Sequence, residues 1–208
     1  MLSKRTYLVI KRVIDRCASG AVLIAASPVL MAVAVSIKAT DPGPVLFRQQ
    51  RAGQDGVPFE ILKFRTMNAA APATSAEAYA WSDGVPDDFV FKSSGDHEER
   101  MTRTGSLLRR WSLDELPQLV NVWRGEMSLV GPRPELLEIV ECYSADQRRR
   151  LEVRPGITGW AQVNGRSGID HGRKIAADLY YVDHASLAFD LKILVRTLKV
   201  ALTGSHSY

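Results

Sequence analysis

The sequence predicts an α+β fold that is mainly helical and monotopic, entering a membrane from one side without crossing it. Three observations predict it: an uncharged run is broken near its middle by a proline, two strand-like runs are separated by turn residues, and apolar residues recur at helical spacing in the second half. We therefore expect a re-entrant helix-break-helix over residues 1–40. A domain over residues 41–208 should hold a small β-hairpin and most of the helices.

The N-terminal apolar run is expected to enter the membrane and return. Residues 18–37 carry no charge, and as a helix they extend about 30 Å, the thickness of the hydrocarbon core. Pro28 bends such a helix, and the Ser27 hydroxyl can satisfy the carbonyl that the proline leaves without a donor. Both flanks are basic, and basic flanks stay cytoplasmic. Ser27-Pro28 is thus the expected break. A straight span and a buried core helix are the alternatives, and a cleaved signal peptide is not expected.

Residues 45–67 are predicted to form the β-hairpin. Two runs of apolar and basic residues are separated by Gly53 and the pair Asp55-Gly56, which is a turn signal. Lys63 and Arg65 are two residues apart, so they project from the same face of the second strand. They either meet an anion or are solvated on the surface.

Residues 68–95 are rich in Ala, Pro, Ser and Asp and have no sustained period, so we expect a long loop or lid with at most short helical pieces and without assigned chemistry. Beyond it, residues 104–123 place apolar side chains at helical spacing. Trp111 and Trp123 belong to this set and are expected near a core.

Two adjacent carboxylates, Asp114 and Glu115, lie inside this helical segment. Ser112 followed by Glu115 fits the capping-box pattern at a helix start. A cap is the more common role for such a pattern. A helix start also favours negative charge and binds phosphate, so capping does not exclude phosphate chemistry. The local pattern leaves both interpretations open.

Two loops rich in Pro and Gly follow. Arg133 lies between two prolines, and Gly156, Gly159 and Gly165 in the second loop are expected to allow close approach of the chain to a ligand. Arginines held in this way suit phosphate oxygens. Between the loops, residues 143–152 are typical of a capped helix, with its arginines facing solvent or lipid headgroups. These are Arg148, Arg149 and Arg150.

The last predicted helix, over residues 186–202, is amphipathic and basic. It either lies in the plane of the lipid headgroups or packs on a core as an ordinary surface helix. Its apolar positions are Leu187, Leu191, Leu194, Val195 and Leu198, and its basic ones are Lys192, Arg196 and Lys199.

The composition limits the class of partner. With 208 residues, a formal charge of +4 and a pI near 9.2, the chain suits one domain with an appendage and an anionic partner. A nucleic acid is one such partner, but no base-reading motif is present. Cys17 and Cys142 lie in different contexts, which indicates a reducing compartment rather than a disulfide framework. The histidines have no zinc-ligand spacing.

Several long motifs together resemble one family, the bacterial sugar transferases, which are monotopic phosphoglycosyl transferases. The motifs are the segment from Lys11 through Ser27-Pro28, "DPGPVLFRQQRAGQDGVPFEILKFRTM", "SLDELPQLVNVWRGEMSLVGPRPE" and "RPGITGWAQVNGR". The chain is similar to the small form, with only the membrane hairpin and the catalytic domain. Residues 69–96 are the part least similar to the family pattern.

The resemblance implies transfer of a phosphosugar from a UDP-sugar to undecaprenyl phosphate, with release of UMP and use of Mg²⁺. It places the enzyme on the cytoplasmic face of the bacterial inner membrane, among inner-leaflet lipids, as the first membrane step of glycan assembly. Asp114 would be the nucleophile and Glu115 a metal ligand. The family motifs supply further candidate substrate and phosphate partners, which are Lys63, Arg65, Arg109, Arg133, Arg154, Gln162, Asn164 and Arg166.

A membrane-anchored scaffold that binds glycan-assembly enzymes without catalysis is the alternative function. Neither the particular sugar nor the oligomeric state is predicted.

Overall fold

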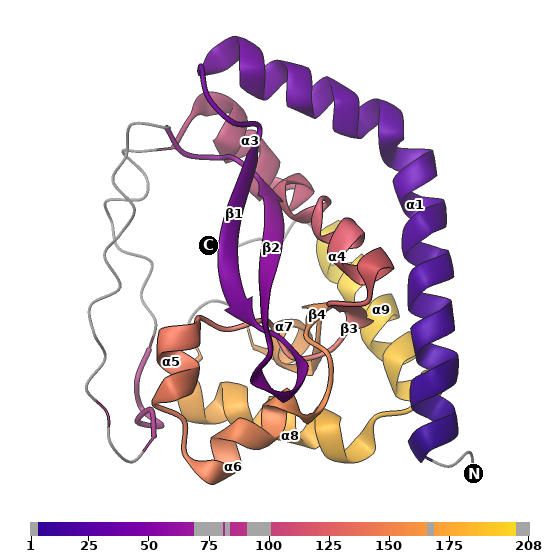
Figure 1. Ribbon diagram of the computed structural model, residues 1–208, viewed down its shortest axis with the longest axis vertical. Helices are drawn as coiled ribbons and strands as arrows, with labels where there is room; N and C mark the ends of the chain where they lie inside the picture. Colours follow the sequence, from indigo (N-terminus) through magenta and orange to yellow (C-terminus); the bar gives the residue numbers. More distant parts are fainter. Residues whose placement is uncertain (1–3, 69–80, 82–83, 91–100, 166–168, 203–208) are drawn as a thin grey trace.

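The elements follow one another as a long helix, a hairpin and a helical body with a second small sheet. A computed structural model (Figure 1) describes residues 4–68, 81, 84–90, 101–165 and 169–202. The chain is mainly helical, as predicted. Its elements are α1 (Lys4–Thr40), β1 (Leu46–Ala52), η1 (Gln54–Gly56), β2 (Pro58–Phe64), α3 (Arg103–Arg110), η2 (Leu113–Glu115), α4 (Gln118–Arg124), β3 (Ser128–Val130), α5 (Leu137–Glu141), α6 (Ala145–Arg148), η3 (Arg149–Glu152), β4 (Gly156–Thr158), α7 (Trp160–Asn164), α8 (His171–His184) and α9 (Leu187–Leu202).

The apolar run forms one continuous helix, α1, which bends along its length and wraps two sides of the molecule (Figure 1). Pro28 lies inside it and lacks the N–H that would bond to the Ile24 carbonyl. The Ser27 hydroxyl donates to that carbonyl at 2.8 Å. The expected compensation of the proline by Ser27 is thus confirmed, although the helix is not divided into two elements.

Among the described residues, α1 is the one helix long and apolar enough to cross a membrane. Only 6% of its most apolar 18-residue stretch is buried. Ile24, Met31 and Val35 are among its exposed apolar side chains. A core helix of a soluble protein would bury these residues. The buried-core alternative for this run is therefore wrong.

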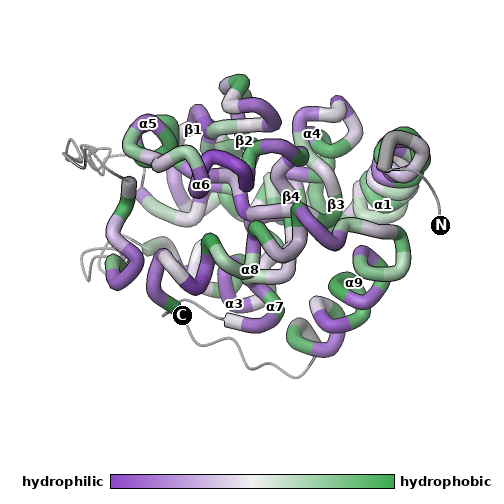
Figure 2. The backbone as a smooth tube through the Cα atoms, turned by 90° about the horizontal axis from the view of Figure 1, so that it is seen from below, coloured by the Kyte–Doolittle hydropathy of each residue, from purple (hydrophilic) through white to green (hydrophobic). Residues whose placement is uncertain are grey.

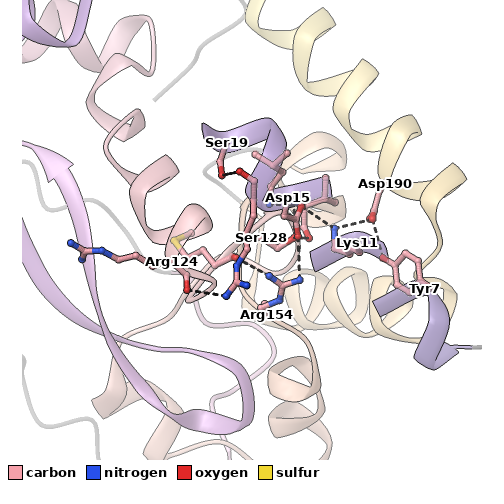
Figure 3. Close-up of polar contacts among 12 residues, drawn as sticks. Tyr7, Lys11, Asp15, Ser19, Arg124, Ser128, Arg154 and Asp190 are labelled. Atoms are coloured by element: carbon pink, nitrogen blue, oxygen red, sulfur yellow. Dashed lines mark hydrogen bonds and ion pairs between the residues drawn. The ribbon is translucent and has the colours of Figure 1, made fainter. Parts of the chain in front are cut away.

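Both ends of α1 pack on the rest of the chain. Near its C-terminal end, Val33 and Ile37 share a cluster with Phe64 of β2 and Leu108 of α3. Near its N-terminal end, a stripe of polar residues four apart faces inward (Figure 3). The stripe consists of Tyr7, Lys11, Asp15 and Ser19.

The polar stripe binds the C-terminal half of the chain. Lys11 Nζ donates to Asp190 Oδ2 of α9 at 2.8 Å. Asp15 accepts from the Ser128 hydroxyl at 2.8 Å and from Arg154 Nη2 at 3.2 Å. Because Lys11, Asp15 and Asp190 are buried, these contacts fix the first turns of α1 to β3 and α9.

The predicted hairpin is confirmed. Strands β1 and β2 pair antiparallel from Leu46 opposite Phe64 to Ala52 opposite Pro58. The turn holds Asp55 and Gly56 with positive φ values of 56° and 76°, a conformation that Gly, Asn and Asp adopt most readily.

A second sheet was not predicted. Strands β3 and β4 pair in parallel over three residues each. They bring the two Pro/Gly loops together backbone to backbone, and a Cβ atom on Gly156 would lie 2.1 Å from the Gly131 nitrogen. At Gly156 and Gly159 the close neighbour is the backbone of Gly131. At Gly165 an added Cβ would lie 2.6 Å from the Ile169 side chain. The expected approach of these glycines to a ligand stays a prediction.

Helix α9 exposes the apolar stripe that the sequence indicated. Leu191, Val195 and Leu198 are 63%, 58% and 63% exposed, whereas Ile193 is fully buried. Polar and apolar segments alternate along α9 in Figure 2. Three residues of the predicted stripe are thus turned away from the core, whereas Leu194 packs against the cluster that contains Ile193.

Candidate active site

The two adjacent carboxylates lie on a 3-10 turn, η2, between α3 and α4. Ser112 starts this turn with a left-handed φ of 53°, and its side chain makes no capping hydrogen bond. A capping residue needs an extended backbone to aim its oxygen at the first amides of the helix. The capping-box interpretation of Ser112 and Glu115 is therefore wrong, and the Glu115 carboxylate is directed elsewhere.

Two cations bind the Glu115 carboxylate. Its Oε1 accepts from Lys63 Nζ of β2 at 2.9 Å and from Arg133 Nη2, on the loop after β3, at 2.7 Å. The Glu115 side chain is 18% exposed and that of Arg133 is 47% exposed. Three segments that are distant in sequence thus meet at one carboxylate, and the cluster is open to solvent on the side of Arg133.

The surroundings shift the two carboxyl groups in opposite directions. Burial raises the pKa of Asp114, and the charge of Glu115 raises it further, against Lys63 and Arg109. Burial also raises the pKa of Glu115, but Arg133 and Lys63 outweigh it and hold that pKa well below its usual range. Neighbouring carboxyls with separated pKa values are typical of sites where the two groups have different chemical tasks.

The structure brings five of the sequence-predicted site residues to this cluster. Besides Lys63, Asp114, Glu115 and Arg133, the guanidinium of Arg109 acts on the Asp114 carboxyl. The Arg109 Nε donates to the Thr66 hydroxyl at 3.2 Å, which orients the side chain.

The other predicted residues have partners elsewhere or lie outside the described chain. Arg65 donates to the Asp41 carbonyl at 2.6 Å, Arg154 binds Asp15, and Asn164 Oδ1 accepts from Arg196 Nη1 at 2.8 Å. Within the described part of the chain, the buried amide of Gln162 makes no hydrogen bond. Arg166 lies outside the described residues.

The loop that carries Arg133 is supported from behind by a buried charge network. Arg150 Nη2 donates to the Arg133 carbonyl at 2.8 Å, and the same nitrogen lies 2.7 Å from Asp178 Oδ2 of α8. Glu135, two residues after Arg133, forms ion pairs with Arg150 and with other cations. Those other cations are Arg51 and Lys174.

Sequence reasoning missed this network. Arg150 is 2% exposed, so its expected place in solvent or among headgroups is wrong. The helix itself was predicted correctly, because Ser144 and Gln147 form a capping box at the start of α6. A run of three arginines is typical of an exposed helix end, and nothing in the local pattern distinguishes the one whose partner lies 28 residues away on α8.

The residues present fit a magnesium ion. The described residues hold no group of three or more His, Cys, Asp or Glu side chains that would enclose a metal. Magnesium in phosphoryl-transfer sites is bound by one or two carboxylates, with substrate phosphates and water completing its ligands. The pair Asp114 and Glu115 meets this requirement, and the lowered pKa of Glu115 keeps that carboxylate ionised.

Comparison with known proteins places the whole chain in one family. Residues 6–204 match the family model described as bacterial sugar transferase. An uncharacterized sugar transferase, EpsL of Bacillus subtilis, is 40% identical over 95% of this chain and 89% of its own length. A UDP-glucose:undecaprenyl-phosphate glucose-1-phosphate transferase of Caulobacter vibrioides is 43% identical over 95% of this chain and 72% of its own length.

A third relative, from Aeromonas hydrophila, is named as a UDP-N-acetylgalactosamine-undecaprenyl-phosphate N-acetylgalactosaminephosphotransferase. It is 38% identical over 98% of this chain, which spans 46% of that protein. Because the family model matches residues 6–204 and these relatives are 38% to 43% identical over at least 95% of the chain, the chain belongs to the bacterial sugar transferase family.

Proposed function

We propose that the chain is a phosphoglycosyl transferase that moves a phosphosugar from a UDP-sugar to undecaprenyl phosphate. The observation that carries the proposal is the buried Asp114 beside a Glu115 whose charge is held by Lys63 and Arg133. A carboxylate with several cations around it suits phosphoryl transfer, in which charge on the phosphate oxygens must be neutralised. The names of two relatives agree with the substrates.

In the first step, an Asp114 carboxylate oxygen attacks the phosphorus that carries the sugar. The bond from that phosphorus to the bridging oxygen of UMP breaks, UMP leaves with the electron pair, and an acyl phosphate joins Asp114 to the phosphosugar. Such covalent catalysis divides one difficult displacement into two easier ones. Lys63 and Arg109 oppose the rise in the pKa of Asp114 and so favour its ionised, nucleophilic form.

In the second step, a phosphate oxygen of undecaprenyl phosphate attacks the same phosphorus. The acyl phosphate bond breaks, the Asp114 carboxylate is restored, and undecaprenyl-diphosphate-sugar is formed. Arg133, half exposed at the edge of the cluster, is placed to bind phosphate oxygens with its planar guanidinium. Bound magnesium, held by Glu115, would neutralise charge on the donor diphosphate.

We also propose a re-entrant, cytoplasmic-face topology for α1. Its N-terminal turns bind α9 and β3 through Lys11 and Asp15, and its C-terminal turns pack on β2 and α3. Two ends held by one body lie on the same side of a bilayer, so only the exposed apolar middle of α1 enters it. This placement brings a soluble nucleotide sugar and a membrane-bound phosphate to one site.

Release of UMP by the purified full-length protein tests the proposal. UDP-glucose, UDP-galactose and their N-acetylated amino analogues are each incubated with undecaprenyl phosphate and magnesium in detergent. We expect UMP and a lipid-linked sugar from at least one donor. Absence of UMP with every donor from folded protein would contradict the proposal and favour a non-catalytic scaffold.

A further inference from the structure

Residues 111–124 expose tryptophans and bury amides. Trp111 and Trp123, which the sequence placed near a core, are 56% and 57% exposed, whereas Gln118 is 2% exposed and Asn121 is fully buried. An exposed apolar side chain is common on protein surfaces, but a buried polar one needs a hydrogen-bond partner. The partners of the two amides therefore show what each of them does.

Gln118 and Asn121 belong to one row of side chains on the inner face of this segment. Around Pro117 the backbone hydrogen bonds join positions three apart, as from the Leu119 amide to the Leu116 carbonyl at 3.1 Å. Side chains three apart lie over one another in a helix of this kind. The row therefore consists of Glu115, Gln118 and Asn121.

Both ends of this row bind strand β2. The Glu115 carboxylate accepts from Lys63 Nζ at 2.9 Å, and Asn121 Oδ1 accepts from the Leu62 amide at 3.1 Å. Because Gln118 lies between Glu115 and Asn121 in the row, its buried side chain faces the same strand. The Gln118 amide is therefore placed beside the ion pair of the candidate active site.

No described residue binds the amide nitrogen of Gln118. Its Nε2 atom is buried without a hydrogen bond, whereas the neighbouring Asn121 side chain bonds to the Leu62 amide and to the Glu60 carbonyl. A buried donor without a partner costs free energy, and native proteins keep few of them. Such a donor next to reactive groups is typical of a site where the partner is a ligand.

We propose that Gln118 is a substrate-binding residue, whose amide donates a hydrogen bond to a phosphate oxygen of the donor diphosphate. The inference rests on the proposed function, which brings that diphosphate to Asp114, about one helical turn before Gln118. The side chains of Lys63 and Glu115 are 22% and 18% exposed where they meet, and phosphate oxygens compete with Glu115 for the lysine. The diphosphate thereby reaches the amide, and a hydrogen bond to an ionised group is strong enough to offset the burial of the donor.

Denaturant unfolding of the full-length protein in detergent separates a ligand-binding amide from a structural one. In Gln118→Leu an apolar side chain of similar size replaces the unpaired donor, so we expect an unfolding midpoint equal to or above that of the wild type. In the control Asn121→Leu the Leu62 amide and the Glu60 carbonyl lose their partner, so the midpoint should fall. A midpoint of Gln118→Leu below that of the wild type would overturn the proposal, because the amide would then have a structural role.

Calorimetric titration with UDP in the presence of magnesium measures the proposed contact itself. UDP carries the diphosphate of every candidate donor and transfers no sugar. We expect Gln118→Leu to raise the Kd of UDP by about tenfold or more, the effect of losing a hydrogen bond to a charged group. The matched control is Gln50→Leu, which changes an exposed glutamine on β1 and should leave the Kd unchanged.

Equal UDP affinities of Gln118→Leu and the wild type, or no binding of UDP by the wild type, would also overturn the proposal. Neither measurement depends on turnover. A wild type that binds UDP more tightly than Gln118→Leu but releases no UMP from any donor would retain the Gln118 contact and lose the proposed transfer. Release of UMP together with equal UDP affinities would do the opposite.

Discussion

At the scale of single residues, Asp114 and Glu115 are separated by their surroundings rather than by their chemistry. Glu115 is fixed by two cations, Lys63 and Arg133, so it is ionised and immobile. Asp114 is buried beside that charge, and its pKa is raised. Glu115 is therefore suited to holding a cation, and Asp114 is suited to forming a covalent bond.

The substitution Glu115→Gln should lower UMP release by about 10²-fold or more, the loss found when an electrostatic group is removed from an active site. It takes away the charge that pairs with Lys63 and Arg133 and would bind magnesium. Initial rates at saturating donor and magnesium measure the effect. The matched control is Glu60→Gln, which removes an exposed carboxylate paired with Arg48 and should leave the rate unchanged. Equal rates for the two variants would contradict the role of Glu115.

Acid should destabilise the fold in two stages. Burial, with Lys174, lowers the pKa of His171 from 6.5 to about 4, so the unfolded chain binds a proton first and stability falls from pH 6.5 toward about 4. Burial raises the pKa of Glu135, but Lys174 and Arg150 outweigh it and lower that pKa from 4.5 to about 2. The contribution of Glu135 to the free energy of unfolding is therefore fully present above pH 4.5 and is lost as the pH falls toward about 2.

Denaturant unfolding across this pH range checks both stages in wild type and Glu135→Gln. The variant leaves buried cations without their carboxylate and should lose about 3 to 5 kcal/mol at neutral pH. It should keep the first stage and lack the second, so the two stability curves converge in acid. A constant gap between them would show that Glu135 does not act through its charge.

At the scale of elements, the sequence predicts what depends on neighbours along the chain. The bond from Ser27 that compensates Pro28, the hairpin turn at Asp55 and Gly56, and the capped start of α6 at Ser144 are all confirmed because each depends on residues within one turn. The exposure of Trp123 was not predictable, because helical spacing shows which residues are apolar and not whether protein or lipid covers them.

Contacts between distant residues were missed for a related reason. The candidate site needed Lys63, Glu115 and Arg133 to meet, and only the family resemblance indicated it, since no local rule pairs β2 with η2. Likewise Lys11 was interpreted as part of a basic flank, although its partner Asp190 lies 179 residues away. Burial of a charge depends on a partner that local periodicity cannot show.

The bend of α1 should be needed for its topology. We expect a cysteine at Ser3 to be shielded from an impermeant thiol reagent added outside intact cells, in a background with Cys17→Ser and Cys142→Ser. Replacing Pro28 with Leu restores a backbone donor, favours a straight span and should increase labelling from outside. Strong labelling in the parent protein would contradict the re-entrant arrangement.

The polar stripe of α1 should contribute strongly to stability. Lys11→Met leaves buried Asp190 without its cation, whereas Asp15 keeps Arg154, and should cost about 3 to 5 kcal/mol. Because Lys11 and Asp190 are in contact, Asp190→Asn should not add its full cost to that of Lys11→Met. A double-mutant cycle by denaturant unfolding measures this coupling, and additive costs would show that the ion pair does not hold α1.

At the scale of the whole molecule, the proposed topology places one chemical site between a water-soluble donor and a lipid acceptor. Both ends of α1 are held by the body. The η2 turn connects α3 to α4, and Figure 1 shows these two helices inside the bend of α1. The relatives differ in the sugar of their names, glucose in one and N-acetylgalactosamine in another. The names of the relatives therefore agree on the transfer and differ in the sugar, and most of residues 69–96 lie outside the described residues.

The central claim is that Asp114 carries the phosphosugar, and intact-protein mass spectrometry tests it most directly. The protein is mixed with magnesium and the UDP-sugar that supports turnover, without lipid acceptor. We predict release of UMP and a gain in protein mass equal to one sugar phosphate. Asp114→Asn, which keeps the size of the side chain, should show neither. An Asn variant that forms the adduct or turns over at near wild-type rate would contradict the covalent mechanism proposed for this chain.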